Sequence, residues 1–367
     1  MSGVLERELE KTEALEAALS RIAAGAEALD AEPSPAFPES AFRELERAGA
    51  TAFNAVAGPS RPPALQELRL VRRVAEADGS VGRIFDGHLN AVERIAVQGP
   101  PPLRERELQA AAAGELRAGV WGGDPGPGEG TPAAVLTRGR ERVLRGVKTF
   151  CSGAGGVQRA LVLAHDPDGG PPLLVWIDVG ADADRVAIDL SWYRSHGLRG
   201  SVSHRVIFDD APVLAQLGPP GAISAQPWFG RDALRTSASW AGMADSAVQA
   251  AMQELRGRPG RGQLEALAAG RLLTAQRTIS VWIEAAAGAM DGIRPDLAAV
   301  ALHARAAISE ACRVLLDEAA RACGSRPFAR GGMLDRARRD LEVFLLQHRL
   351  DPLLARAGET ALNGNGD

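Results

Sequence analysis

Apolar residues recur at three- and four-residue spacing through the first third of the chain, a pattern typical of amphipathic helices. In residues 4–28 this stripe comprises Leu5, Leu9, Leu15, Leu19 and Ile22. Four further helices are predicted, over 42–48, 63–77, 80–97 and 103–114. Since no strand pattern interrupts them, residues 1–115 are predicted to form an N-terminal helical domain.

The period changes between residues 116 and 225. Short runs rich in Val, Leu and Ile alternate there with clusters of Gly, Pro and Asp, which indicates strands and turns. After a first strand that ends near Trp121, strands are predicted over 133–137, 142–150, 160–164, 173–177, 186–190 and 203–208, with a turn at 209–212. Strands at this spacing predict a small antiparallel β-barrel or sandwich.

Long Ala- and Leu-rich helices dominate residues 226–367. They are predicted over 228–256, 262–290, 295–322 and 333–347. Four such helices joined by short loops predict a C-terminal four-helix bundle. The fold class is therefore α+β: a helical domain, a β-barrel domain and a bundle.

Composition excludes several classes of protein. Among 367 residues the net charge is −4, with no basic patch, which argues against a nucleic-acid or membrane-surface binder. The charged, amphipathic N-terminus does not resemble a secretory signal, and no apolar run approaches 18 residues, so we expect a cytoplasmic protein. Three cysteines without a CxxC pair predict neither a disulfide framework nor a metal site.

Five short segments carry candidate chemistry: 78–82, 120–126, 146–156, 197–203 and 322–328. Two of them have a plain structural explanation: a helix break with a serine cap at 78–82 and a flexible loop at 120–126. The loop at 120–126 also leaves backbone N–H groups free to approach a flat or anionic ligand. At 146–156 a strand ends in an aromatic residue, a hydroxyl and several glycines, which suits a flat heterocycle.

In this order the segments resemble motifs of the acyl-CoA dehydrogenase superfamily of flavoproteins. The sequence KTFCSG at 148–153 is similar to the family's GxKxWITNG strand, and GLRGSVS at 197–203 is similar to GMRGSDT. The loop at 120–126 resembles TEPGxGSD, and 323–328 resembles FGGxGF. The resemblance extends from about residue 42 to about residue 350.

The resemblance implies bound FAD. It places Phe150 beside the flavin ring and the Ser152 hydroxyl near the reactive nitrogen of the ring. It places Trp121 and the loop around Gly123 along the opposite edge.

The family also shares its cofactor between subunits, so the resemblance implies a homo-oligomer, a dimer or a tetramer. Gln263 and a nearby arginine would hold the pyrophosphate and adenine end of a neighbour's FAD, and Gly324 and Arg326 would face its adenine. The arginine is Arg256, Arg258 or Arg261.

The family's catalytic glutamate is missing, and His348 stands at its position. A histidine there can act as a base or a hydrogen-bond donor, or lie in a surface cluster. Asp232 near the start of the first bundle helix is the second candidate base, or else a carboxylate facing the helix dipole. His88 and Ser80 are predicted to face substrate, the alternative for His88 being a satisfied buried histidine.

Three functions follow from these residues. The first is an FAD-dependent oxidoreductase acting on a small acyl or acyl-CoA-like substrate. The second is a monooxygenase or oxidase of the same fold, which uses O₂ and a flavin reductase or another electron-transfer partner. The third is a catalytically silent scaffold. We favour a flavin-dependent oxidoreductase, because Phe150 and Ser152 are kept while the catalytic glutamate is not.

Overall fold

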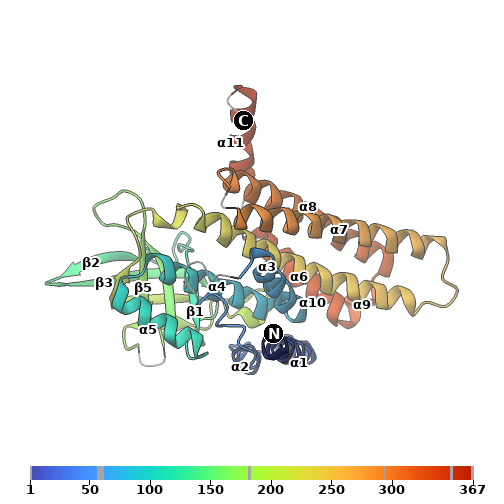
Figure 1. Cartoon of the computed structure of the whole chain (residues 1–367), viewed down its shortest axis with the longest axis horizontal. Coiled ribbons are helices and arrows are strands. Elements are labelled where there is room, and N and C mark those ends of the chain that lie inside the picture. Colours follow the sequence, from blue (N-terminus) through green and yellow to red (C-terminus); the bar gives the residue numbers. More distant parts are fainter. Residues whose placement is uncertain (1, 56–61, 181–182, 293, 348–349, 365–367) are drawn as a thin grey trace.

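The computed structural model describes residues 2–55, 62–180, 183–292, 294–347 and 350–364. A helical N-terminal part is followed by a sheet and then by long helices (Figure 1). The first helices are α1 Ser2–Ala31, α2 Glu39–Arg47, α3 Ala64–Ala77, α4 Gly79–Gln98 and α5 Pro101–Ala112. The strands are β1 Ala118–Trp121, β2 Ala134–Arg138, β3 Glu141–Cys151, β4 Arg159–Ala164, β5 Leu173–Asp178, β6 Val186–Asp189 and β7 His204–Gln216. The later helices are α6 Trp228–Arg256, α7 Gln263–Asp291, α8 Leu297–Cys323, α9 Arg326–Arg330, α10 Met333–Leu346 and α11 Asp351–Leu362.

The predicted helices of the first third are confirmed, and local chemistry explains their ends. Prolines at 33, 35 and 38 separate α1 from α2, and α5 begins with a proline in its first turn, where the missing N–H costs nothing. Helix α4 is capped by Asp78, whose carboxylate accepts the N–H of Val81 at 2.8 Å. Asp78, and not Ser80, is therefore the N-cap.

The sheet differs from the predicted antiparallel barrel. Its strand order is β1-β4-β5-β7-β3-β2, with β6 also paired to β7. The β1–β4 pair is parallel, so the sheet is mixed, and no ladder between described strands joins β1 to β2 to close it. Isolated bridges at Gly123–Thr149 and Ala134–His165 hold its two halves together.

Strand β7 crosses the position of the predicted turn at 209–212 without stopping. It pairs with β3, β5 and β6, and Pro212 lies opposite Val143 within the ladder. The strand is irregular at this position: Asp210 has a φ of +54°, and the pairing with β3 shifts register between Leu144 and Gly146.

The four predicted bundle helices are α6, α7, α8 and α10. Helix α4 lies between this bundle and the sheet, since it contacts both β1 and α6 (Figure 1). The division into three domains at residues 115 and 225 stays a prediction. Helix α11 buries no residue and projects from the body. None of the described helices is long and apolar enough to cross a membrane.

Candidate functional site

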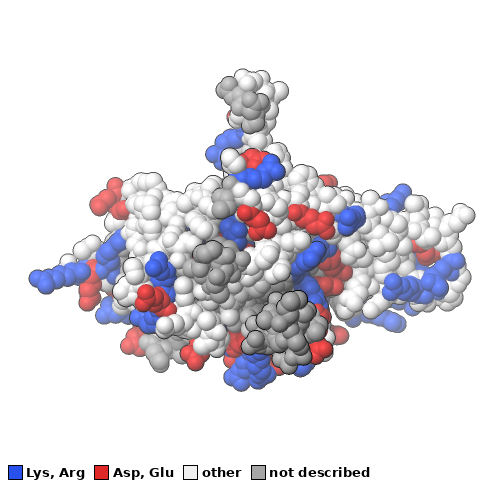
Figure 2. Space-filling model, viewed as in Figure 1, with Lys and Arg blue, Asp and Glu red and all other residues white. Residues whose placement is uncertain are grey.

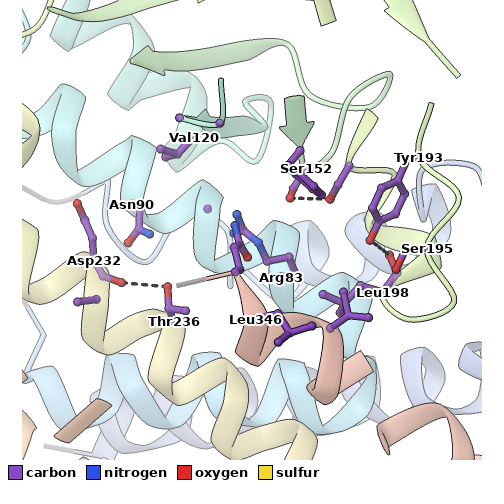
Figure 3. A pocket seen from close by; sticks show the side chains of 18 of the residues that line it. Arg83, Asn90, Val120, Ser152, Tyr193, Ser195, Leu198, Asp232, Thr236 and Leu346 are labelled. Atoms are coloured by element: carbon purple, nitrogen blue, oxygen red, sulfur yellow. Dashed lines mark hydrogen bonds between the residues drawn. The ribbon is translucent and has the colours of Figure 1, made fainter. Parts of the chain in front are cut away.

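A cavity of about 800 Å³ lies where α4, α6, α8 and α10 meet the ends of β1 and β3 and the loop before β7 (Figure 3). A cavity of this size accommodates a cofactor or another small molecule. Four residues singled out from the sequence line it: Gly123, Phe150, Ser152 and Asp232. Its wall also includes a set of apolar side chains: Val120, Leu198, Ile223, Phe229, Val343 and Leu346.

The glycine-rich loop after β1 forms one edge of the cavity and is fastened to β3. The N–H of Thr149 donates to the carbonyl oxygen of Gly123 at 2.9 Å. A Cβ atom on Gly123 would lie 2.6 Å from the Thr149 carbonyl oxygen, so only glycine permits this approach. Gly122 has open space where its Cβ would be, so its backbone is accessible to a ligand.

A buried lysine fixes the same loop through a carboxylate. Lys148 on β3 is only 1% exposed, and its Nζ donates to Asp124 Oδ1 at 2.7 Å. His165 Nε2 lies 2.9 Å from Asp124 Oδ2. Burial acts in the opposite direction, but the hydrogen bonds from Lys148 and His165 hold the pKa of Asp124 below its ordinary value. The loop is therefore anchored by an ionised carboxylate.

Phe150 sits at the rim of the cavity in a strained conformation. Its φ is +54°, in the left-handed region, where a register shift interrupts the pairing of β3 with β7. The ring is 55% exposed and meets Trp192 edge to face, with ring centroids 4.9 Å apart. Backbone strain of this kind costs on the order of 1–3 kcal/mol and is concentrated at functional sites.

Three serine hydroxyls form a chain that ends at the cavity. Ser152 Oγ lies 2.8 Å from Ser203 Oγ, and Ser203 Oγ lies 2.8 Å from Ser201 Oγ. Trp121 does not line the cavity: it is 1% exposed, and its Nε1 donates to the Ser152 carbonyl at 3.0 Å. Trp121 thus supports the Ser152 backbone from behind.

Tyr193, the one tyrosine of the sequence, lies beside these serines (Figure 3). Its hydroxyl lies 3.3 Å from the carbonyl oxygens of Gly197 and Leu198 and points toward Ser195. Burial raises the pKa of Tyr193, so the phenol is neutral near pH 7 and keeps its proton for donation.

Asp232 on α6 lies across the cavity from Ser152 (Figure 3). Its Oδ2 accepts Arg94 Nη2 at 2.6 Å, and its Oδ1 lies 3.2 Å from Arg235 Nη1. Burial raises the pKa of Asp232, while the two arginines oppose that rise. Both carboxylate oxygens are engaged by arginines, and the role of Asp232 as a base stays a prediction.

These ion pairs belong to a buried network that joins α3, α4 and α6. Arg231 binds Glu67 and Glu93 at 2.8 Å each, and Arg235 binds the same two carboxylates at 2.6 and 2.7 Å. Burial alone would raise the pKa of Glu67, but Arg235 and Arg231 lower it to about 2. Because each charge has a partner, the network fixes α4, and with it the cavity wall, against the bundle.

Arg305 on α8 differs from these arginines. It lines the cavity, is 6% exposed and stacks over Trp240 with 5.6 Å from its Cζ to the ring centroid. Its Nε and Nη2 have no hydrogen-bond partner among the described residues. Burial lowers the pKa of Arg305 to about 10, so it remains charged at neutral pH. Arg305 was not predicted from the sequence, where its only distinguishing feature is a charge within the Ala- and Leu-rich run at 297–308.

Neither of the two residues predicted to face substrate lines the cavity. His88 is fully buried, and its Nδ1 accepts the N–H of Ala118 at 3.2 Å. Nε2 therefore carries the proton and donates to the Thr51 carbonyl at 2.8 Å. Burial lowers the pKa of His88, which makes it a neutral structural histidine. Ser80 is 5% exposed within the first turn of α4.

The residues predicted to hold the adenine end of FAD lie at the opposite end of the bundle from the sheet (Figure 1). All of them are exposed and none lines the cavity: Arg256, Gln263, Gly324 and Arg326. Arg258 ties this end together by donating to the Cys323 carbonyl at 2.9 Å. His348 lies outside the described residues, although its neighbour Gln347 lines the cavity.

Solved structures with the same fold were found, whereas no protein-family model and no curated protein sequence matches the chain. TdsC from Paenibacillus sp. A11-2, in complex with FMN and indole, is 17% identical, with 98% of each chain covered and a TM-score of 0.81. Another structure of that protein names it dibenzothiophene monooxygenase. Butyryl-CoA dehydrogenase from Megasphaera elsdenii is 17% identical over 96% of this chain and 98% of its own, with a TM-score of 0.82. Methanesulfinate monooxygenase MsuC from Pseudomonas fluorescens is 21% identical over 97% of each chain, with a TM-score of 0.77.

The chain therefore has the acyl-CoA dehydrogenase fold, which dehydrogenases and monooxygenases share. The resemblance inferred from the five sequence segments is confirmed at the level of the fold. Function has to be argued from the cavity, because this fold hosts more than one reaction.

Proposed function

We propose that this protein is a flavin-dependent oxidoreductase. The observation that carries the proposal is the open cavity of about 800 Å³ beside Phe150 and Ser152. A catalytically silent scaffold has no need of such a cavity and would be expected to fill it with side chains.

The residues around this cavity fit a flavin ring. Phe150, Trp192 and Val120 offer apolar surface to a flat ring, and Ser152 offers a hydroxyl to its polar edge. The backbone of Gly122 is open to a ligand as well. When bound, the flavin supplies the redox chemistry, whereas the chain supplies binding and orientation.

The remaining polar groups orient this site. Ser203 holds the Ser152 oxygen in place through a hydrogen bond and is itself held by Ser201. Tyr193 keeps its proton near neutral pH and fastens the segment at Gly197 and Leu198 through their carbonyl oxygens. The apolar part of the wall favours a ligand with an apolar body.

Among the reactions of this fold, the site favours oxygen-using chemistry over dehydrogenation of acyl-CoA. Removal of an α-proton needs a positioned base. Asp232 is the carboxylate that lines the described cavity, and Arg94 and Arg235 occupy both of its oxygens. We propose that the enzyme is a monooxygenase or oxidase that receives electrons from a partner reductase. His348 is a candidate hydrogen-bond donor in this reaction. TdsC and MsuC support this only as analogies of fold.

The proposal includes FAD as the flavin and an oligomer as the active form. Basic side chains gather where α6 ends and α7 begins, at the end of the bundle farthest from the sheet (Figure 2). This end contains Arg256 and Gln263, which are too remote to serve the cavity of their own chain and would serve that of a neighbour. Leu273, Val281 and Trp282 form an apolar strip on α7, which Thr274, Arg277 and Thr278 interrupt. Leu273 is 52% and Val281 48% exposed, which suits contact with another subunit.

Titration of the purified protein with FAD and FMN, followed by flavin fluorescence, tests the proposal. We expect binding of one or both flavins. In the presence of a flavin reductase, NADH and O₂, we expect oxidation of a substrate, whereas acyl-CoAs should not bleach the flavin anaerobically. Absence of affinity for either flavin would support the scaffold alternative, and anaerobic bleaching would support the dehydrogenase.

A further inference from the structure

Arg305 is a buried cation without a carboxylate partner among the described residues. The buried arginines Arg94, Arg231 and Arg235 each bind at least one carboxylate at 2.6–2.8 Å. Arg305 is 94% buried by comparison, forms none of the recorded ion pairs and leaves Nε and Nη2 without a hydrogen bond. A buried charge in this state is costly unless a ligand completes its hydrogen bonds.

The guanidinium is also held in place. It stacks on Trp240, whose ring meets Phe344 edge to face at 6.1 Å and 89°. Trp240 and Phe344 are buried, so the aromatic surface against which the guanidinium lies is itself held in place. A planar guanidinium has parallel N–H donors that match the two oxygens of a carboxylate.

We propose that Arg305 binds the carboxylate of the substrate, which is a small, mainly apolar acid. The inference rests on the proposed function, since the ligand is the substrate of the flavin site. Arg305 comes from the helical wall of the cavity, whereas Phe150 and Ser152 come from the sheet wall. The ring of the flavin is proposed at the sheet wall, so the space toward α8 belongs to the substrate.

The surroundings of Arg305 define the rest of this substrate. Helices α6 and α10 contribute Phe229, Val343 and Leu346, which favour an apolar body. Asp232 does not compete for the guanidinium, because Arg94 and Arg235 already engage it. A neutral ligand of the same shape would leave the charge of Arg305 unpaired, so the site should reject amides and esters.

Benzoate and its neutral isostere benzamide test the proposal in calorimetric titrations of the full-length protein, with and without added flavin. We expect benzoate to bind about 10-fold or more tightly than benzamide, as hydrogen bonds to charged groups imply. Arg305→Met should abolish this preference, and Arg305→Lys should retain part of it. Arg313→Met, which removes an exposed arginine of the same helix, is the control and should leave the preference intact.

Each outcome decides the inference. A wild-type protein without a preference for benzoate, or an Arg305→Met variant that keeps it, overturns the proposal. Arg305→Met should melt no lower than wild type, because it removes an unpaired buried charge. If this variant loses affinity for FMN but not for riboflavin, the guanidinium binds the flavin phosphate and the proposal is wrong. Because benzoate is also titrated without flavin, a failure of flavin binding would remove the proposed function and leave the carboxylate site to be judged separately.

Discussion

The hydroxyl of Ser152 lies 2.8 Å from that of Ser203, although 51 residues separate them in the sequence. The contact joins the end of β3 to the segment before β7, and both residues line the cavity. The position of the Ser152 oxygen is thus held by Ser203 before any ligand arrives, which reduces the entropy that binding must overcome.

Ser152→Ala should weaken flavin binding roughly 3- to 10-fold, the value of one hydrogen bond. Flavin fluorescence titration measures the change. Ser20→Ala, at an exposed position on α1, is the control. Unchanged affinity in Ser152→Ala would remove this hydroxyl from the proposed site.

Phe150→Gly should be more stable than Phe150→Ala by about 1 kcal/mol, because glycine adopts a positive φ without penalty. Both variants should bind flavin less well, since both lose the ring. Chemical denaturation measures the stability difference. Equal stability of the two variants would show that the backbone relaxes at this position.

Asp124→Ala should destabilise the protein by about 1–3 kcal/mol, more than Lys148→Met does. The first variant strands a buried ammonium, whereas the second removes that ammonium and leaves a 42% exposed carboxylate beside His165. Urea denaturation of both variants tests this order. His165→Ala, at an exposed position, should have the smallest effect. The reverse order would mean that Lys148 is not buried in solution.

Asp340 should make stability depend on pH. It is 3% exposed and accepts the Leu198 N–H at 2.5 Å. Burial and the nearby Asp78 raise the pKa of Asp340 from 3.8 to about 7. The Leu198 N–H and Arg336 act in the opposite direction but are weaker. The folded protein therefore holds this proton more tightly than the unfolded chain, so the stabilisation is complete below about pH 4 and is lost as the pH rises through about 7.

The melting temperature is thus expected to be higher at pH 6 than at pH 8. Asp340→Asn should flatten this difference. Thermal unfolding across this pH range measures both. A wild-type protein that is more stable at pH 8 would contradict the assignment.

Val281→Glu should dissociate the proposed oligomer by placing a charge in the apolar strip of α7. Light scattering during size-exclusion chromatography measures the mass. Ala23→Glu, an exposed helical position on α1, is the matched control. A wild-type monomer would contradict the shared-cofactor proposal directly.

Local signals were sufficient for the elements and for part of the site. Prolines and glycines mark the helix ends, and β-branched runs mark the strands, because both act through the backbone nearby. Phe150 and Ser152 could be found for the same reason: a strand end with glycines behind it is a local pattern. These residues do line the cavity.

Contacts between distant segments could not be predicted in this way. The composition at 209–212 indicates a turn, yet Arg138 and Arg145 bind Asp210 from the neighbouring strands while β7 runs on. The sequence left His88 as either a substrate-facing or a satisfied buried histidine, because its partners Thr51 and Ala118 come from distant segments. Likewise, an arginine on an Ala-rich helix gives no sign of which carboxylates lie near it.

Tyr193 gives the cavity an intrinsic reporter. Since the sequence contains one tyrosine, fluorotyrosine incorporated during expression would produce a single fluorine resonance, without any need for assignment. That label would lie among Ser195, Gly197 and Leu198, so its chemical shift would report ligand binding at this one position in the cavity wall.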